Sequence, residues 1–206
     1  MKINEIFLSI QGEGLEMGLP TVFVRTSDCN LRCNYCDTTY AYNESKELSV
    51  KEIFAIIEDF GIKRVSITGG EPLLQKEELL QLIEKLEDYS ISVETNGSID
   101  VSRLPENIKI SLDIKCPSSG ESNKMRYDNL NHLKISDQVK FIMATDEDYN
   151  YAKAIVEKFN VPNVFFTPVG GLDAQKIVKK VLKDKLNLRI GLQLHKIIWN
   201  KDLRGV

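Results

Sequence analysis

The chain has 206 residues, of which 42% are hydrophobic, enough for one domain with a sizeable buried core and too few for two. Its 27 basic and 30 acidic residues are interspersed and give a net charge of −3, which argues against a nucleic-acid surface or an anionic-membrane anchor. No apolar run approaches the roughly 20 residues that cross a bilayer, and Glu5 interrupts the stretch that a signal peptide would need. We therefore expect a cytoplasmic protein.

Strands and helices are predicted to alternate along the chain. Runs of apolar and β-branched residues indicate the strands, and an apolar period of 3.6 residues behind capping residues such as Ser49 and Thr145 indicates the helices. In chain order we predict a strand at 21–26, a helix at 49–60, a strand at 64–68, a helix at 76–88, strands at 91–95, 108–114 and 139–143, a helix at 146–158, a strand at 164–167, a helix at 174–183 and a strand at 188–192.

This alternation predicts a parallel sheet with right-handed crossovers. The connections after Glu94 and after Lys115 carry weak helical signals, so we expect the helical layer to be incomplete. The predicted α/β fold is an open, partial (β/α) barrel in which residues 1–206 form a single domain. A doubly wound sheet is the competing arrangement.

The unusual short motifs all stand directly after predicted strands. They occupy residues 29–39, 69–72, 94–97 and 113–115. The C-terminal ends of parallel strands form one face, where the active sites of such folds are assembled. We therefore expect these motifs to meet in one mouth.

Three of the four cysteines, Cys29, Cys33 and Cys36, fall within one short segment. Clustered thiolates in a cytoplasmic chain indicate metal ligation rather than disulfides. Three thiolates hold three irons of a [4Fe–4S] cluster and leave the fourth iron without a protein ligand. An open iron can chelate an amine and a carboxylate, the pair that S-adenosylmethionine (SAM) offers.

The C-x-x-x-C-x-x-C spacing, with Tyr35 before the last cysteine, resembles the signature of the radical SAM superfamily. This resemblance implies one-electron cleavage of SAM to methionine and a 5′-deoxyadenosyl radical, which abstracts a hydrogen atom from a substrate. It also implies that the glycine-rich loop at residues 68–72 holds the SAM amino group. The residues expected to bind the cofactor are Tyr35, Cys36, Asp37, Gly70, Asp113, Ile114 and Lys115.

Five further segments, at residues 9–14, 23–26, 36–38, 193–196 and 204–206, make nearly the whole chain similar to the family of 7-carboxy-7-deazaguanine synthases. The resemblance implies conversion of 6-carboxy-5,6,7,8-tetrahydropterin to 7-carboxy-7-deazaguanine with loss of ammonia, in 7-deazapurine (queuosine and archaeosine) biosynthesis. It further implies Mg²⁺ near the substrate carboxylate, an electron donor such as flavodoxin or ferredoxin, and a homodimer.

The same resemblance indicates which residues meet the pterin. Arg25 offers a planar fork for a carboxylate, and Gln11 and Glu13 suit the amide and amino edge of the ring. Thr38 offers a hard oxygen for Mg²⁺, and the carboxylate of Val206 is expected to reach the substrate. The full expected substrate set is Gln11, Gly12, Glu13, Arg25, Thr68, Glu94, His195 and Val206.

Some of these residues also suit a structural role. Arg25 could pair with Asp28 or Asp37, and His195 could be a core histidine whose hydrogen bonds are satisfied. Cys116 is given no role, because free cysteines are usually small buried hydrophobes.

Two other functions fit part of the sequence. A small activating enzyme that installs a glycyl radical on a partner protein would share the cysteine motif and the partial barrel, but it would not need Gln11, Glu13 and Arg25. A zinc-binding, non-catalytic module would use the three clustered cysteines with a fourth ligand from Cys116, His132 or His195.

Overall fold

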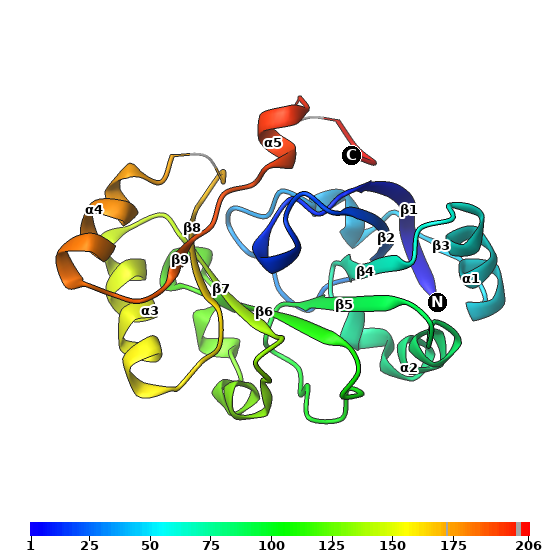
Figure 1. Ribbon diagram of the computed structural model, residues 1–206, viewed down its shortest axis with the longest axis horizontal. Coiled ribbons are helices and arrows are strands. Elements are labelled where there is room, and N and C mark those ends of the chain that lie inside the picture. The colour runs from blue at the N-terminus through cyan, green and yellow to red at the C-terminus, as the bar shows by residue number, and fades with distance from the viewer. Residues whose placement is uncertain (172, 201–202) are drawn as a thin grey trace.

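The computed structural model describes residues 1–171, 173–200 and 203–206. Within these ranges nine strands form one sheet, in the order β3-β1-β2-β4-β5-β6-β7-β8-β9 (Figure 1). The strands are β1 (Lys2–Ile10), β2 (Pro20–Thr26), β3 (Lys46–Glu47), β4 (Arg64–Gly69), β5 (Ser90–Thr95), β6 (Lys109–Lys115), β7 (Gln138–Met143), β8 (Val164–Pro168) and β9 (Arg189–Ile190).

Helices cover the outer face of this sheet (Figure 1). The α-helices are α1 (Val50–Asp59), α2 (Lys76–Lys85), α3 (Asp146–Lys158), α4 (Gln175–Asp184) and the short α5 (His195–Ile198). The 3-10 helices are η1 (Gly14–Glu16), η2 (Thr39–Tyr42), η3 (Pro72–Gln75), η4 (Pro117–Ser119), η5 (Ser122–Lys124) and η6 (Tyr127–His132). None of the described helices is long and apolar enough to cross a membrane.

The strand order identifies the fold as a partial barrel. Strands β2 and β4 to β9 form a parallel series in chain order, while β1 pairs antiparallel with β2 and with β3. A doubly wound sheet would reverse the order of its parallel strands at a switch point, and this parallel series does not. Strands β3 and β9 stand at the two ends of the sheet, so the barrel is open, as predicted.

The local signals that predicted the helices are present in the structure. The Ser49 side chain accepts from the Glu52 backbone and the Glu52 carboxylate accepts from the Ser49 backbone, a complete capping box at the start of α1. Thr145 caps α3 in the same way with Asp148. Between β5 and β6 the described chain forms no α-helix, and between β6 and β7 it forms only η4, η5 and η6. The expected incomplete helical layer is confirmed.

The main differences from the predictions are two strands that were not predicted, β1 and β3, and two elements that are shorter than predicted. Strand β1 was not predicted, because it lies near the edge of the sheet, and among its residues only Ile3 is fully buried, so its apolar pattern is weak. The strand predicted at 188–192 is reduced to β9, and the helix predicted at 76–88 ends at Lys85. The predicted strands at the centre of the sheet are confirmed because their apolar runs are buried on both faces or packed under helices.

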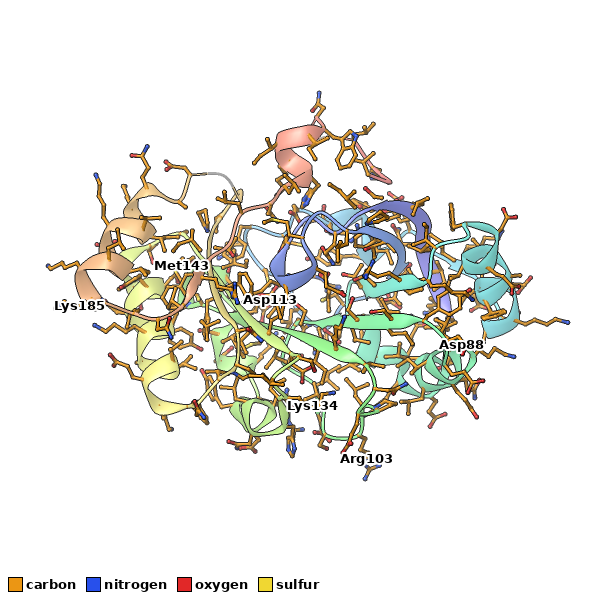
Figure 2. All side chains as sticks on the ribbon, in the orientation of Figure 1. Asp88, Arg103, Asp113, Lys134, Met143 and Lys185 are labelled. Carbon is orange, nitrogen blue, oxygen red and sulfur yellow. The ribbon has the colours of Figure 1, made fainter. Side chains whose placement is uncertain are left out.

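Side-chain alternation along the strands separates a core from a polar interior. Val65, Val93, Leu112 and Phe141 face the helices and are fully buried in the hydrophobic core. The residues on the other parity of the same strands, such as Ser66, face the inside of the barrel. Figure 2 shows side chains filling the body of the fold.

At the C-terminal ends of the strands, the positions that face the inside of the barrel carry polar side chains. Register pairs Arg25 of β2 with Thr68 of β4, and Asp113 of β6 with Lys140 of β7. Glu94 of β5 has the same parity. These side chains therefore converge at the mouth of the barrel, where the sequence motifs were expected to meet.

Candidate active site

Two cavities adjoin at this mouth in the part of the chain that the structure describes. The outer cavity has a volume of about 330 Å³ and lies between β1, β2 and the C-terminal segment, residues 195–200 and 203–206. The cysteine cavity has a volume of about 200 Å³ and lies over the C-terminal ends of β4 to β8. Four residues line both cavities: Glu13, Asp37, Thr68 and Glu94. A molecule in one cavity is therefore in reach of a molecule in the other.

The cysteine cavity collects most of the residues predicted to bind the cluster and SAM. Its lining includes Cys29, Cys33, Tyr35, Cys36, Asp37, Gly70, Asp113 and Lys115. Ile114 does not line it: this side chain has the opposite parity on β6 and lies fully buried in the core. Only the backbone of Ile114 remains available to a ligand, which the alternation of the strand explains.

The three thiols form a donor set that fits an iron–sulfur cluster. All three are free and half-buried, and they line the same cavity. The backbone N–H of Leu31 and the side-chain amide of Asn96 donate to Cys29 Sγ at 3.5 and 3.7 Å. Such N–H···S contacts are typical of cluster thiolates, whose charge they disperse. Burial raises the pKa of the Cys33 thiol to about 11, so this thiol binds as a thiolate only when a metal displaces its proton.

Asn96 is itself held by a buried carboxylate. Glu71 is fully buried, and it accepts from the Asn96 backbone at 2.7 Å and from the Thr95 hydroxyl at 2.8 Å. Burial raises the pKa of this carboxyl group above its ordinary value, although the hydrogen bonds oppose that effect. The glycine loop is thus fastened to the end of β5 from behind, opposite the cavity.

Gly70 lies against the start of the cysteine loop, residues 29–37. A Cβ atom at Gly70 would stand 1.9 Å from the carbonyl oxygen of Asp28 and 3.1 Å from Cβ of Cys29. The glycine is therefore required for a close approach of two backbone segments, in addition to any contact with a ligand. The same contact sets the position of the first cysteine relative to the glycine loop.

The outer cavity contains every residue of the expected substrate set. Gln11, Gly12, Glu13, Arg25, Thr68, Glu94, His195 and Val206 all line it. Thr38 lines neither cavity; its hydroxyl donates to Asp37 Oδ1 at 3.0 Å, next to both of them.

Arg25 stands in the outer cavity with a partner that the sequence did not suggest. Its Nε donates to Glu5 Oε1 at 2.7 Å, and its guanidinium lies over the rings of Phe7 and Tyr40. The Tyr40 hydroxyl donates to the same Glu5 oxygen at 3.0 Å. The structure gives no ion pair between Arg25 and Asp28 or Asp37. Because Glu5 is engaged through Nε, the two terminal nitrogens keep the fork that a carboxylate would bind.

His195 belongs to the cavity wall rather than to the hydrophobic core. A Cβ at Gly12 would stand 2.0 Å from His195 Nδ1, so the imidazole lies directly on this glycine. The backbone N–H of Leu194 donates to the Gly12 carbonyl at 2.9 Å, which holds α5 on the same loop. Burial lowers the pKa of His195, while the nearby Glu13 charge acts in the opposite direction.

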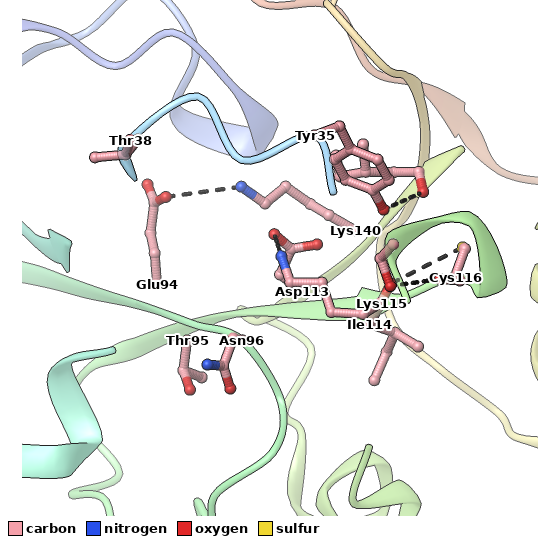
Figure 3. A network of polar contacts seen from close by, with 12 residues as sticks. Tyr35, Thr38, Glu94, Thr95, Asn96, Asp113, Ile114, Lys115, Cys116 and Lys140 are labelled. Carbon is pink, nitrogen blue, oxygen red and sulfur yellow. Dashed lines mark hydrogen bonds and ion pairs between the residues drawn. The ribbon is translucent and has the colours of Figure 1, made fainter. Parts of the chain in front are cut away.

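Sequence reasoning missed Lys140 and the role of Gln193. Lys140 is buried, with Nζ 2.9 Å from Glu13 Oε2 and 3.7 Å from Glu94 Oε2, as Figure 3 shows for Glu94. Gln193 donates from Nε2 to Glu13 Oε1 at 2.6 Å. A lysine at an interior position of a strand that is otherwise apolar was the available signal, since buried lysines occur almost only with charged partners.

Lys115, in the motif at the end of β6, also forms an ion pair. Lys115 Nζ lies 2.8 Å from Asp113 Oδ2, and both side chains are mostly buried (Figure 3). Burial acts to lower the pKa of Lys115, but the Asp113 charge raises it above the ordinary value. This pair is therefore charged and buried in the wall of the cysteine cavity, and it differs from an exposed surface pair.

The candidates for a fourth zinc ligand do not join the three cysteines. Cys116 is fully buried beside the Ile114 carbonyl, His132 ends η6, and His195 lines the outer cavity. In the described ranges, no three Cys, His, Asp or Glu side chains converge on one metal position. A [4Fe–4S] cluster makes no such demand, because each thiolate binds a different iron.

Comparisons with known proteins give a consistent result. Residues 23–119 match the radical SAM superfamily. The chain is 44% identical over 201 residues to the 7-carboxy-7-deazaguanine synthase of Methanospirillum hungatei, covering 96% of this chain and 85% of that protein. It is 37% identical over 228 residues to the enzyme of the same name from Koribacter versatilis, with 100% of both covered. Its fold is similar to the crystal structure of QueE from Escherichia coli, with a TM-score of 0.79, 23% identity and 94% of each chain covered.

Proposed function

Because the chain belongs to the family of 7-carboxy-7-deazaguanine synthases, within the radical SAM superfamily, we propose that it converts 6-carboxy-5,6,7,8-tetrahydropterin to 7-carboxy-7-deazaguanine with loss of ammonia. The observation that carries this conclusion is the pair of adjoining cavities with a shared wall. One contains three free thiols, and the other is lined by a guanidinium, carboxylates and amides suited to a carboxylated pterin.

The cysteine cavity is assigned to the cluster and to SAM. Cys29, Cys33 and Cys36 hold the [4Fe–4S] cluster, and Tyr35, Asp37, Gly70, Asp113, Lys115 and the backbone of Ile114 contact SAM. When bound, the cluster and SAM supply a 5′-deoxyadenosyl radical that takes a hydrogen atom from the substrate. The chain contributes enclosure: the half-buried thiols and the charged wall keep this step away from bulk water.

The outer cavity is assigned to the pterin. The Arg25 fork binds the substrate carboxylate, and Glu13, Glu94 and Gln11 receive and give the hydrogen bonds of the amide and amino edge. Gly12 lets the His195 ring approach, Thr68 adds a hydroxyl, and an oxygen of Val206 closes the set. The four residues common to both cavities place the reacting carbon next to SAM.

Mg²⁺ is assigned to Thr38 together with oxygens of the substrate. The Thr38 hydroxyl donates a hydrogen bond to Asp37, which leaves the lone pairs of the hydroxyl oxygen for a cation, and both groups offer the hard oxygens that Mg²⁺ prefers. A single protein hydroxyl is a weak ligand, so the metal would be held only when substrate is present.

The proposal also covers the location, the oligomeric state and the partners of the enzyme. Residues 1–206 act as one radical SAM domain in the cytoplasm, as a homodimer, with flavodoxin or ferredoxin as electron donor and without a nucleic-acid or membrane partner. The product enters 7-deazapurine biosynthesis, towards queuosine or archaeosine.

The test is anaerobic reconstitution followed by turnover with SAM, Mg²⁺, a reductant and the carboxytetrahydropterin. We expect 7-carboxy-7-deazaguanine and ammonia in equal amounts. A reconstituted protein that cleaves SAM but leaves the pterin unchanged, and that forms a glycyl radical on a partner protein, would establish the activating-enzyme alternative instead.

A further inference from the structure

Lys140 joins the two cavities. It extends from β7 into the barrel, its side chain is 7% exposed, and it lines the cysteine cavity. Its ammonium reaches Glu13 and Glu94, two of the three carboxylates that line both cavities. Figure 3 shows Lys140 and Glu94 directed towards each other across the mouth, with Asp113 nearby on β6.

The two carboxylates share this ammonium in the same way. Glu13 and Glu94 both turn Oε2 to Lys140 and keep Oε1 for a neutral amide. Gln193 Nε2 donates to Glu13 Oε1 at 2.6 Å, and Gln11 Nε2 donates to Glu94 Oε1 at 3.0 Å. The backbone N–H of Glu13 donates to Gln11 Oε1 at 3.2 Å, which sets the orientation of that amide. One buried cation thus lies at the centre of a chain of five side chains, joined by hydrogen bonds and, between Lys140 and Glu94, by an ion pair.

We propose that Lys140 is a positioning residue for the pterin: it keeps Glu13 ionised, and it holds Glu13 and Glu94 turned so that they present acceptors to the donor edge of the ring at the junction with SAM. This inference rests on the proposed function, because it takes the pterin as the ligand of the outer cavity.

The charges around Lys140 support this role. The groups that face it are Glu13 from the loop after β1, Glu94 from β5 and Asp113 from β6, and His195 of α5 faces Glu13 in turn. Burial acts to raise the pKa of Glu13, but the Lys140 charge and the Gln193 hydrogen bond lower it below the ordinary value. The carboxylates raise the pKa of Lys140 despite its burial, so the ammonium stays charged.

Without Lys140, carboxylates in a partly enclosed site face each other with no counter-charge. Burial and like charge then favour the protonated form of Glu13 near neutral pH. A protonated carboxyl group loses acceptor capacity and gains a donor, which faces the donors of the pterin edge. Raising the pH restores the acceptor. Loss of Lys140 should therefore make substrate affinity pH-dependent, which loss of a merely structural residue would not do.

The experiment is Lys140→Met in the reconstituted holoenzyme, with two readouts from pH 6 to pH 9. Anaerobic titration with the carboxytetrahydropterin should show affinity reduced by about tenfold or more at pH 7, recovering towards the wild-type value as the pH rises. Unfolding without pterin should show the opposite trend. A carboxyl group with a raised folded pKa binds more protons when folded, so the deficit in stability relative to wild type grows with pH.

Two control variants narrow the interpretation. Lys140→Arg keeps the charge and should keep a flat pH profile, even if its turnover falls. Lys153→Met removes another paired lysine, 2.8 Å from Asp184 and distant from both cavities, and should bind the pterin as wild type at every pH.

Each outcome of these experiments supports or overturns the inference about Lys140. Wild-type affinity in Lys140→Met, or a loss that is equal at every pH, would overturn the inference, and so would a pH-dependent Lys140→Arg. If Lys140→Met is unfolded at neutral pH, recovery of the fold at pH 6 supports the charge role and unfolding at every pH contradicts it. If wild-type protein does not bind the pterin at all, the proposed function fails, while the pH dependence of stability still tests the role of Lys140.

Discussion

Lys196 of α5 and Asp37 of the cysteine loop form an ion pair across the mouth, with Nζ and Oδ2 2.8 Å apart. Asp37 lines both cavities. Burial acts to raise the pKa of Asp37, but the hydrogen bond and charge of Lys196 lower it below the ordinary value. Arg204 pairs with Glu44 at 2.8 Å and lies over the Tyr40 ring, which adds a second tie. The C-terminal segment is therefore anchored to the cysteine loop and to the residues that directly follow it.

Breaking this anchor should weaken pterin binding in the outer cavity and leave the cluster intact. We expect Lys196→Met to lower pterin affinity by roughly fivefold, because a partly exposed ion pair contributes up to about 1 kcal/mol. Lys180→Met, which removes a paired lysine near Asp146 on the helical face, is the matched control and should have no effect. Titration with the pterin and iron analysis measure the two sites separately. Loss of iron in Lys196→Met with unchanged pterin binding would contradict this assignment.

The cysteines should separate into three ligands and one structural residue. Alanine at Cys29, Cys33 or Cys36 should abolish the cluster and SAM cleavage, because each thiolate holds its own iron. Cys116→Ala should retain about four irons per chain, the cluster stoichiometry, since Cys116 is fully buried and burial strongly raises the pKa of its thiol. The measurement is the iron and sulfide content after anaerobic reconstitution. Loss of iron in Cys116→Ala would disprove the assignment of the cluster to three cysteines.

Gly70→Ala should damage both the cluster and SAM binding. The expected role of Gly70 in holding SAM predicts, by itself, a loss of SAM binding only. In the structure, however, the new Cβ would meet the Asp28 carbonyl at 1.9 Å, so the backbone before Cys29 must move. Gly18→Ala is a control for backbone strain without a clash: its φ is +90°, but nothing lies within 4 Å of its Cβ position, whereas Gly70 has no positive φ and its Cβ would clash. Iron content and SAM titration are the measurements; a full cluster in Gly70→Ala would show that the backbone can absorb the shift.

Arg25 should contribute more to pterin binding than its ion pair with Glu5 does. Arg25→Ala is expected to cost about 2–5 kcal/mol of pterin binding, the usual cost of removing one member of a desolvated charged pair. Arg25→Lys should rescue little, because an ammonium does not reproduce the planar fork. Glu5→Gln keeps a hydrogen-bond acceptor for Nε and should retain most of the affinity. Equal losses in Arg25→Ala and Glu5→Gln would mean that Arg25 only supports the structure.

Acidification should destabilise the protein through His195. Burial lowers its pKa in the folded state, so below the unfolded value of about 6.5 the unfolded chain binds more protons. This contribution to stability is present above that pH and is lost as the pH falls through the folded pKa. His195→Gln should flatten the unfolding free energy between pH 7 and pH 5.5, and His132→Gln, at the end of η6, should not. The same slope in both variants would place the effect elsewhere.

Much of the site was predictable because its signals are local. Ligand spacing in the cysteine loop and glycines beside a strand end are read directly from neighbouring residues. Strand alternation then explains why Thr68, Glu94 and Asp113 share one face, and why Ile114 does not join them. The central strands and the capped helices were predicted for the same reason, whereas the weakly buried β1 was not.

By itself, the sequence determined the chemistry of the groups and the order of the strands that deliver them to one mouth. Only the tertiary structure decided the partners: Glu5 for Arg25, Asp37 for Lys196, and Glu13 with Glu94 for Lys140. Lys140 and Glu13 are 127 residues apart, and Lys196 and Asp37 are 159 apart. Such pairs depend on sheet register and on where the C-terminal segment docks. No local pattern encodes either of these, because both follow from the packing of the whole barrel.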